Sequence, residues 1–336
     1  MEHTSPERAA TAPLGPPPPF DPELTTALAA IHELLPPGGS GADPGATPPE
    51  DVPGLAPVTN EALERDGAFR VEERSVPGPV GAPDVSLLIC RPVAAATEVP
   101  ALYHIHGGGM TVGDNRTGVP EMLDLAQELG LSVVSVEYRL APGTQHTGPV
   151  EDCYAGLLWT AEHAAELGID PGRVIVVGGS AGGGLAAAVA LLARDRGGPA
   201  LFGQLLMCPM LDDRNDTPSA LQMTGVGVWD RAANEAGWTA LLGAARGTDG
   251  VSPYAAPARA TDLSGLPAAF IDVGAVETFR DEGVDYAARI WRAGGQAELH
   301  VWPGAFHGFA DMAPRAGVSR DARAARLRWL RRLLAH

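Results

Sequence analysis

A buried strand turns directly into a helix within residues 174–188, which read VIVVGGSAGGGLAAA. Val174–Val177 is a short β-branched run typical of a strand buried on both faces, and Leu185–Ala193 has the composition of a helix. Glycines occupy the corner between them, where the two arms nearly touch and only small residues fit. The corner predicts an α/β fold and holds one hydroxyl, that of Ser180, at its tip.

The residues around Ser180 allow three interpretations. Gly178 and Gly182 complete a Gly-x-Ser-x-Gly pattern typical of a nucleophile elbow, and Ala181 opens a helix whose dipole favours negative charge. Glycine-rich turns of this kind also bind dinucleotide phosphates, and residues 182–187 fit the looser Gly-x-Gly-x-x-Ala form. Close packing alone is the third interpretation, so the rest of the chain has to decide.

The hydrophobic pattern from Phe69 onward alternates between strands and helices. Two hairpin-like strands followed by this alternation predict a mostly parallel, eight-stranded sheet with helices on both faces. The chemistry of such sheets lies at the C-terminal ends of the strands. The expected strands are 69–76, 85–91, 101–106, 132–138, 173–178, 203–208, 268–273 and 297–302, and the expected helices are 119–129, 150–167, 181–195, 231–242, 281–293 and 319–335.

Three stretches lie outside this alternation. Residues 1–20 are rich in proline and alanine, and we expect them to be disordered. Residues 21–60 hold an amphipathic helix that begins after Asp21, followed by a Pro- and Gly-rich linker. Within the main domain, residues 61–336, the segment at about 211–263 breaks the pattern, and we interpret it as an insertion that covers the site.

Length and charge restrict the partners of the protein. The 336 residues can bury a large core, and the net charge of −17 argues against nucleic acid and anionic membranes as partners. The N-terminus has acids and prolines where a signal peptide needs a basic start and an apolar stretch, and no apolar run is long enough to span a membrane. We therefore expect a cytoplasmic protein. Cys90, Cys153 and Cys208 are expected to be core thiols rather than disulfides.

The sequence contains no lysine, and the 24 residues counted as Lys or Arg are all arginine. This excludes a pyridoxal phosphate Schiff base, a Walker phosphate loop, a kinase-type phosphate lysine and a Ser-x-x-Lys hydrolase. If Ser180 is a nucleophile, its base is therefore expected to be a histidine.

Three consecutive glycines follow an expected strand in the stretch YHIHGGGMTVGDNR. Glycine amides can point toward one spot without obstruction, and such donors stabilise the oxyanion of acyl transfer. We predict an oxyanion hole from the amides of Gly107, Gly108 and Ala181. His104 and His106 could begin a metal site, but no third ligand follows at a suitable spacing, so we predict no metal. Instead, we expect His106 to hold the glycine loop by a hydrogen bond.

The predicted base is His307, which follows a strand in the stretch HVWPGAFHGFA. Its loop is bounded by Gly304 and Gly308, whereas His300 lies inside the strand and is a weaker candidate. The acid that orients the imidazole should lie between the serine and the histidine at a strand end.

Four acids in FIDVGAVETFRDEGVDYA meet that condition. Asp272 lies inside the strand pattern, and Asp281 and Glu282 are explained as the cap and first-turn acids of the following helix. Glu277 is left in the loop, and we predict that it is the acid.

With these candidate residues in this order, the chain resembles the hormone-sensitive-lipase-like branch of the α/β-hydrolases, the bacterial family IV carboxylesterases. The resemblance spans roughly residue 69 to the C-terminus and depends on six motifs in order. These motifs are His106-Gly-Gly-Gly109, Tyr138-Arg-Leu-Ala-Pro142, Val150-Glu-Asp152, Gly178-Gly-Ser-Ala-Gly-Gly183, Arg280-Asp-Glu-Gly283 and His307-Gly-Phe309.

The resemblance implies an α/β-hydrolase fold, a Ser-acid-His triad, an oxyanion hole from the first glycines of the loop, and a helical cap built from the N-terminus and an insertion. Three departures bear on substrate preference. The family usually has Asp-Pro-Leu where this chain has Glu277-Thr278-Phe279, and it often has aspartate where this chain has Gly179. The stretch APGTQH also replaces the usual acidic loop that contains His-Pro.

We therefore expect a cofactor-independent serine carboxylesterase for small esters with short to medium acyl chains, a monomer or homodimer. Its pocket is expected to include Met110 and Trp229. A lactonase, amidase or acyltransferase with the same chemistry remains open, as does a non-catalytic small-molecule receptor on the same fold. A dinucleotide-dependent oxidoreductase would need an acid such as Asp212 or Asp213 after the next strand, and it would leave His307 without a role.

Overall fold

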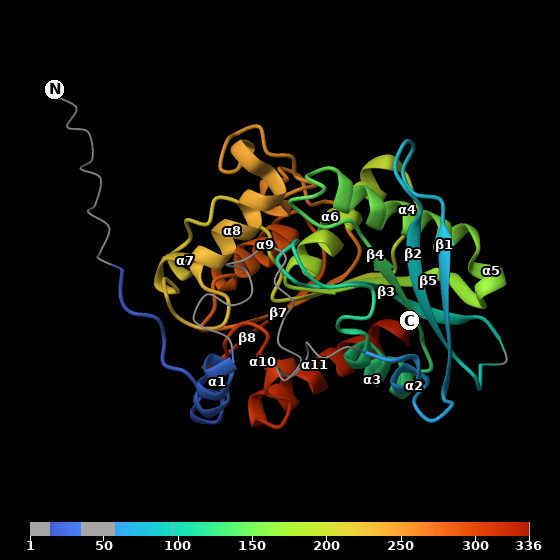
Figure 1. Ribbon diagram of the computed structural model, residues 1–336, viewed down its shortest axis with the longest axis horizontal. Helices are drawn as coiled ribbons and strands as arrows, with labels where there is room; N and C mark the ends of the chain where they lie inside the picture. The colour runs from blue at the N-terminus through green and yellow to red at the C-terminus, as the bar shows by residue number, and fades with distance from the viewer. Residues whose placement is uncertain (1–13, 35–57, 96, 336) are drawn as a thin grey trace.

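The structure is a computed structural model that describes residues 14–34, 58–95 and 97–335 (Figure 1). Eight strands form a single sheet in the order β1-β2-β4-β3-β5-β6-β7-β8. The strands are β1 (Phe69–Val76), β2 (Val85–Pro92), β3 (Val99–Ile105), β4 (Ser132–Glu137), β5 (Ile169–Gly179), β6 (Gly203–Met207), β7 (Ala269–Gly274) and β8 (Ala297–Trp302).

Only β2 runs against its neighbours, because it pairs antiparallel with β1 and β4 while the other pairs are parallel. The prediction of a mostly parallel, eight-stranded sheet is therefore confirmed. The strand β5 lies between β3 and β6, so the corner that follows it lies near the middle of the C-terminal edge of the sheet. This is the edge at which parallel sheets carry their chemistry.

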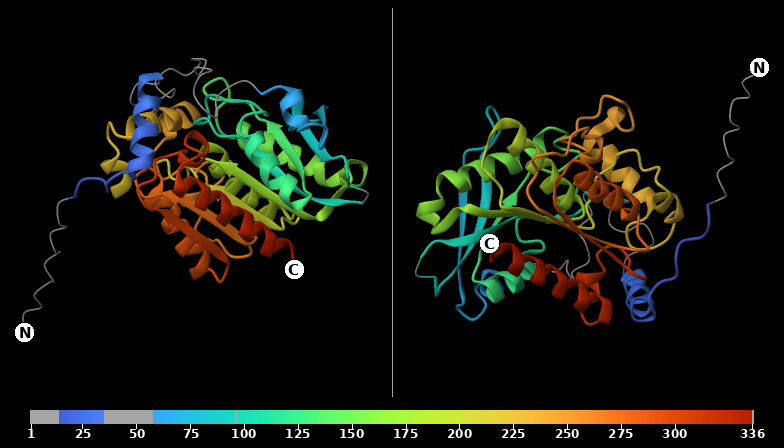
Figure 2. Two further views of the ribbon diagram at one scale, coloured as in Figure 1. Left: turned by 90° about the horizontal axis from the view of Figure 1, so that it is seen from below. Right: turned by 180° about the vertical axis from the view of Figure 1, so that it is seen from behind.

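Helices cover both faces of the sheet, as Figures 1 and 2 show, with α11 on the opposite side from α4 and α6. The main helices are α3 (Val119–Leu129), α4 (Gly148–Glu162), α5 (Ala164–Leu167), α6 (Ala181–Arg196), α9 (Arg280–Arg292) and α11 (Gly317–Leu334). None of the helices in the described ranges has the length and apolar character that crossing a membrane requires.

Each face of the sheet has its own hydrophobic core, because successive side chains of a strand point to opposite faces. In β5, Val174 and Val176 belong to the core beneath α4, α6 and α9. Ile175 and Val177 belong to the core beneath α3 and α11. The continuous apolar run that predicted a doubly covered strand thus serves two cores.

The expected helix over residues 150–167 is in fact two helices. His163 separates α4 from α5, and the left-handed Gly168 ends α5, so that β5 begins at Ile169 and is longer than predicted. Three short helices also escaped prediction, namely α2 (Asn60–Glu64), α7 (Pro218–Gln222) and α10 (Phe309–Met312). Helices of four or five residues have too few turns to show a periodic pattern.

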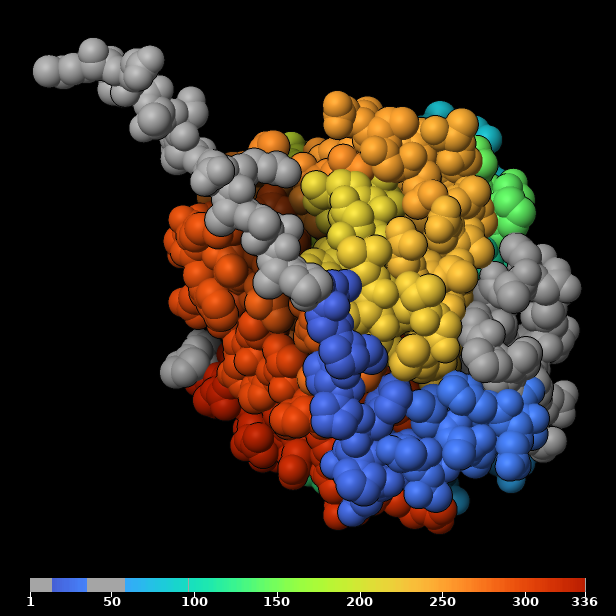
Figure 3. Space-filling view, turned by 90° about the vertical axis from the view of Figure 1, so that its left-hand side faces the viewer, coloured from blue at the N-terminus to red at the C-terminus, as the bar shows by residue number. Residues whose placement is uncertain are grey.

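The N-terminal helix α1 (Pro22–Leu34) lies beside the insertion that contains α7 and α8 (Arg231–Leu242), as the blue and yellow surfaces of Figure 3 show. Its apolar face buries Leu24, Leu28 and Ile31 as the pattern indicated. His32 Nε2 also lies 3.1 Å from the carbonyl oxygen of Gly227 in the insertion. Most of the expected disordered segment and linker, residues 1–13 and 35–57, falls outside the described residues.

Candidate active site

Ser180 occupies the corner between β5 and α6 with φ 57° and ψ −123°, a conformation that is strained for a residue with a side chain. The glycines on either side are required by contact. A Cβ on Gly178 would lie 2.3 Å from the carbonyl oxygen of Gly182, and a Cβ on Gly182 would lie 2.0 Å from that of Ile105. The glycines at positions 178 and 182 are therefore required by the close approach of backbone to backbone at this corner.

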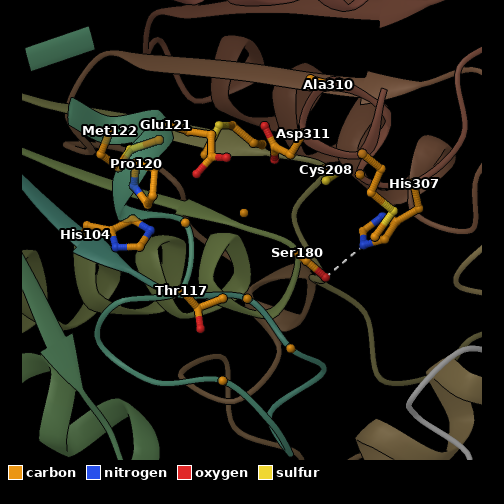
Figure 4. A pocket seen from close by; sticks show the side chains of 18 of the residues that line it. His104, Thr117, Pro120, Glu121, Met122, Ser180, Cys208, His307, Ala310 and Asp311 are labelled. Carbon is orange, nitrogen blue, oxygen red and sulfur yellow. Dashed lines mark hydrogen bonds between the residues drawn. The ribbon is translucent and has the colours of Figure 1, made fainter. Parts of the chain in front are cut away.

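His307 joins Ser180 to Glu277 in one hydrogen-bonded chain, of which Figure 4 shows the contact between Ser180 and His307. The Oγ of Ser180 lies 2.9 Å from Nε2 of His307, and Nδ1 of His307 lies 3.0 Å from Oε1 of Glu277. The other oxygen of Glu277 accepts a 2.7 Å hydrogen bond from the amide of Gly274 at the end of β7. Because Glu277 is almost fully buried, both of its oxygens are held in place.

The other three acids of this segment have different partners. Asp272 pairs with Arg326 of α11 at 3.0 Å. Asp281 accepts a hydrogen bond from the amide of Ser219, and Glu282 accepts one from the amide of Leu211, both at 2.7 Å. Asp281 and Glu282 thus hold the insertion. The sequence pattern explains them only as the cap and first-turn acids of α9.

The acids that a dinucleotide site would use are also occupied. Asp212 pairs with Arg214, and the fully buried Asp213 pairs with Arg259 at 2.7 Å. Neither carboxylate is available for a ribose hydroxyl.

The electrostatics of the site act on His307. Burial lowers the pKa of His307, whereas the adjacent sulfur of Cys208 and the carboxylate of Glu277 raise this pKa, and the net direction is upward. Burial also raises the pKa of the Cys208 thiol. The Glu277 carboxylate, 3.0 Å from Nδ1, is placed to stabilise the imidazolium.

The glycine loop lies against the serine. A Cβ on Gly107 would approach the Ser180 Cβ to 3.5 Å, and Gly108 has φ +109°, a conformation that only glycine adopts readily. Within the described chain, no protein acceptor takes a hydrogen bond from the amides of Gly107, Gly108 or Ala181. Three donors without a protein partner are thus available in the glycine loop and at the start of α6.

His106 braces this loop. Its Nδ1 lies 2.7 Å from the carbonyl oxygen of Gly107, its ring stacks on Tyr138 with centroids 4.2 Å apart, and the Tyr138 hydroxyl donates to the His106 carbonyl at 3.0 Å. Burial lowers the pKa of His106 to about 4 and that of His104 to about 3, so both rings are neutral near pH 7. His104 is a buried strand residue that hydrogen-bonds Ser135.

A cavity of about 640 Å³ opens onto Ser180 and His307 (Figure 4). Trp229 of the insertion lines it, with its ring centroid 6.4 Å from that of His307. The prediction for Met110 is wrong, because its side chain is fully buried in the core and is not part of the cavity wall that the described residues form. The carboxylates of Glu121 and Asp311 lie at the far end of the cavity, and burial raises the pKa of Glu121 to about 7.

Cys208 lines the same cavity as Ser180 and His307, although the sequence had suggested only a core thiol. It follows β6, is only partly buried and lines the same cavity, whereas Cys90 and Cys153 are buried as expected of core thiols. Its apolar context resembled that of the other two cysteines. Its position directly after β6, the strand that pairs with β5, could have indicated that it lies near Ser180.

Comparison with known proteins agrees with this architecture. Residues 102–311 match the family described as alpha/beta hydrolase fold. Over 294 residues the chain is 36% identical to carboxylesterase NlhH of Mycobacterium tuberculosis, with 86% of each chain covered.

Two solved structures are similar along most of their length. A bacterial heroin esterase has a TM-score of 0.81 at 42% identity, with 94% of this chain and 98% of that chain covered. Esterase LipW from Mycobacterium marinum has a TM-score of 0.75 at 35% identity, with 82% and 86% covered. The chain therefore belongs to the α/β-hydrolase fold family, in its hormone-sensitive-lipase-like branch, the bacterial family IV of carboxylic ester hydrolases.

Proposed function

We propose that the protein is a serine carboxylesterase whose catalytic residues are Ser180, His307 and Glu277. His307 Nε2 takes the hydroxyl proton as Ser180 Oγ attacks the ester carbonyl carbon, and Glu277 stabilises the imidazolium. The imidazolium then gives its proton to the leaving alkoxide, and an acyl-enzyme forms. Water attacks the acyl-enzyme by the same route, which releases the carboxylic acid and restores the serine.

The amides of Gly107, Gly108 and Ala181 are proposed to receive the oxyanion of both tetrahedral intermediates. The contact of Gly107 with Ser180 and the absence of protein acceptors for the three amides within the described chain support this role. Ala181 adds the positive end of the α6 dipole. Each donor of this kind typically contributes about 3 kcal/mol to stabilisation of the transition state.

One observation carries the proposal more than any other. The 2.9 Å and 3.0 Å contacts join a strained serine, a histidine and a buried carboxylate drawn from three distant parts of the chain. A binding protein on the same fold would have no need for this order of hydrogen bonds.

We propose substrates with short to medium acyl chains, as the family resemblance implies. The cavity of about 640 Å³ lies in the ordinary range for small-molecule pockets. We further propose that α1 and the insertion act as a cap, since Val228 and Trp229 of the insertion line the cavity and His32 of α1 contacts Gly227. Such a cap excludes water from the acyl transfer step.

The substitution Ser180→Ala tests the proposal. Hydrolysis of p-nitrophenyl butyrate should fall by about 10⁴-fold or more, because the nucleophile is lost and only oxyanion stabilisation remains. Ser75→Ala, which removes an exposed hydroxyl on β1, is the matched control and should retain wild-type turnover. Retained turnover in Ser180→Ala would refute the assignment of the nucleophile.

A further inference from the structure

Cys208 lies beside the proposed base, although the proposed reaction does not use it. Its backbone amide donates a 2.6 Å hydrogen bond to the carbonyl oxygen of Asp272, which holds the residue at the C-terminal edge of the sheet. The side chain is partly exposed and lines the cavity that opens onto Ser180. A small solute in the cavity can therefore reach the sulfur.

Three metal-ligating atoms converge at this point, one each from Cys208, Glu277 and His307, and all lie within 4.8 Å of one another. In the ranges that the structure describes, this is the single group of three such side chains. A tetrahedral zinc site with bonds of about 2.0–2.3 Å places its ligand atoms about 3.5 Å apart. Small rotations of the side chains are enough to reach that spacing.

We propose that a thiophilic divalent cation, such as Zn²⁺ or Cd²⁺, binds Cys208, His307 and Glu277 and reversibly blocks the site. Thiolate and imidazole are ligands that these ions prefer, whereas Mg²⁺ prefers oxygen ligands in octahedral geometry. The cation is an inhibitor that enters from the cavity, and the reaction proceeds without it. The inhibitory consequence rests on the proposed function, since it matters only if His307 is the base.

Coordination removes the base whichever ring nitrogen of His307 the metal takes. On Nε2, the metal occupies the lone pair that receives the Ser180 proton. On Nδ1, it replaces the hydrogen bond to Glu277 and leaves the ring proton on Nε2, which then cannot accept another. The Cys208 thiol loses its proton to solvent as the metal–sulfur bond forms, so binding tightens as pH rises.

The other two cysteines provide an internal control. Cys90 and Cys153 are fully buried and do not belong to the group of metal-ligating side chains. Variants of Cys208 keep both of them, so a change in metal binding reports on Cys208.

Binding is tested by titrating the purified protein with Cd²⁺ and following the ultraviolet charge-transfer absorption of the cadmium–thiolate bond. Wild type and Ser180→Ala should saturate at one equivalent, because Ser180 is not a ligand. Cys208→Ala and Cys208→Ser should lose the absorption, and His307→Ala should bind at least about tenfold more weakly. Using two substitutions at Cys208 keeps the test valid if one of them folds poorly.

Inhibition is tested with p-nitrophenyl butyrate, each protein being compared with its own metal-free rate. Wild type should lose activity at the Cd²⁺ concentration that saturates the absorption and recover it with EDTA, whereas Mg²⁺ should have no effect. In Cys208→Ala the half-inhibiting Cd²⁺ concentration should rise at least about tenfold.

The outcomes separate this inference from the proposed function. A charge-transfer band that persists in both Cys208 variants, or an unchanged half-inhibiting concentration, would overturn the metal site. A Cys208-dependent band in a wild-type protein without esterase activity would support the site and refute the function. An active wild-type enzyme that shows neither band nor inhibition would refute the site alone.

Discussion

Two buried carboxylates lie five residues apart at the end of β7 and have opposite kinds of partner. Asp272, within the strand, pairs with Arg326 at 3.0 Å and accepts a 3.1 Å hydrogen bond from the Trp302 indole. Glu277, in the loop that follows, pairs with His307 at 3.0 Å. Asp272 and Glu277 are both about 1% exposed, so burial does not distinguish them.

The cation decides what each carboxylate does. Arginine keeps its charge at every physiological pH, so the Asp272–Arg326 pair is permanent and fastens α11 to the sheet. Histidine gains and loses its proton in the range where enzymes work, so the pair of Glu277 with His307 can change charge during a reaction. A buried carboxylate at a strand end is therefore not a sign of catalysis until its partner is known.

The largest expected effect comes from Glu277→Gln. A neutral amide stabilises neither the working tautomer of His307 nor its imidazolium, and the analogous loss in a serine protease lowers kcat by about 10⁴-fold. The melting temperature should change less than for Asp272→Asn, because His307 can lose its proton when the carboxylate is removed, whereas arginine cannot. The measurement is kcat on p-nitrophenyl butyrate together with the melting temperature. A variant that keeps more than a small fraction of wild-type kcat would remove Glu277 from the catalytic group.

The opposite pattern is expected for Asp272→Asn. This change leaves the Arg326 charge buried without its partner, which typically lowers the free energy of unfolding by about 3–5 kcal/mol. Urea unfolding followed by tryptophan fluorescence measures the loss. The kcat of the folded protein should fall much less than in Glu277→Gln. If Asp272→Asn is instead stable and inactive, the roles that we assign to the two carboxylates are reversed.

The pH dependence of kcat/KM gives a smaller but more specific signal. The base must be neutral to accept a proton, and the pKa of His307 is raised, so kcat/KM should increase with pH through a midpoint above the ordinary range of imidazole. In Glu277→Gln the residual activity should show a midpoint lower by about one pH unit or more, because the anion that favours the imidazolium is gone.

Asp272→Asn serves as the matched control for this profile and should leave the midpoint in place. An unshifted midpoint in Glu277→Gln would mean that another group sets the pKa of His307.

The smallest effect is expected at a partly exposed pair near the start of β8. Glu298 contacts Arg332 of α11 and lies 2.9 Å from Nε2 of His300, with its side chain about 31% exposed. Solvent screens such contacts, so Glu298→Gln should change the free energy of unfolding by less than about 1 kcal/mol. If Glu298→Gln lowers the free energy of unfolding as much as Asp272→Asn does, then the arginine partner, and not burial, determines how much such a carboxylate stabilises the protein.

The order of strands and helices was predictable because the patterns that encode them are local. All eight expected strands exist, with ends shifted by a few residues at most. Errors arose where the local signal was weak. A left-handed glycine at Gly168 divides one expected helix from the next strand, and helices of four or five residues carry no periodicity.

The candidate site was predictable to an uneven degree. Ser180 was evident because its glycine neighbours are contiguous in sequence and their spacing expresses a steric requirement of one corner. The functions of Asp281 and Glu282 in holding the insertion, the position of Cys208 beside His307 and the burial of Met110 were not. Each of these depends on contacts between segments that are distant in the chain.

The sequence by itself determined the layered α/β architecture and the strained corner, because hydrophobic period and glycine sterics act between neighbouring residues. Only the tertiary structure decided which of four acids meets His307 and which cysteine faces the cavity. Side chains of the same type differ in role according to the partners that folding brings to them, and those partners lie tens to hundreds of residues away.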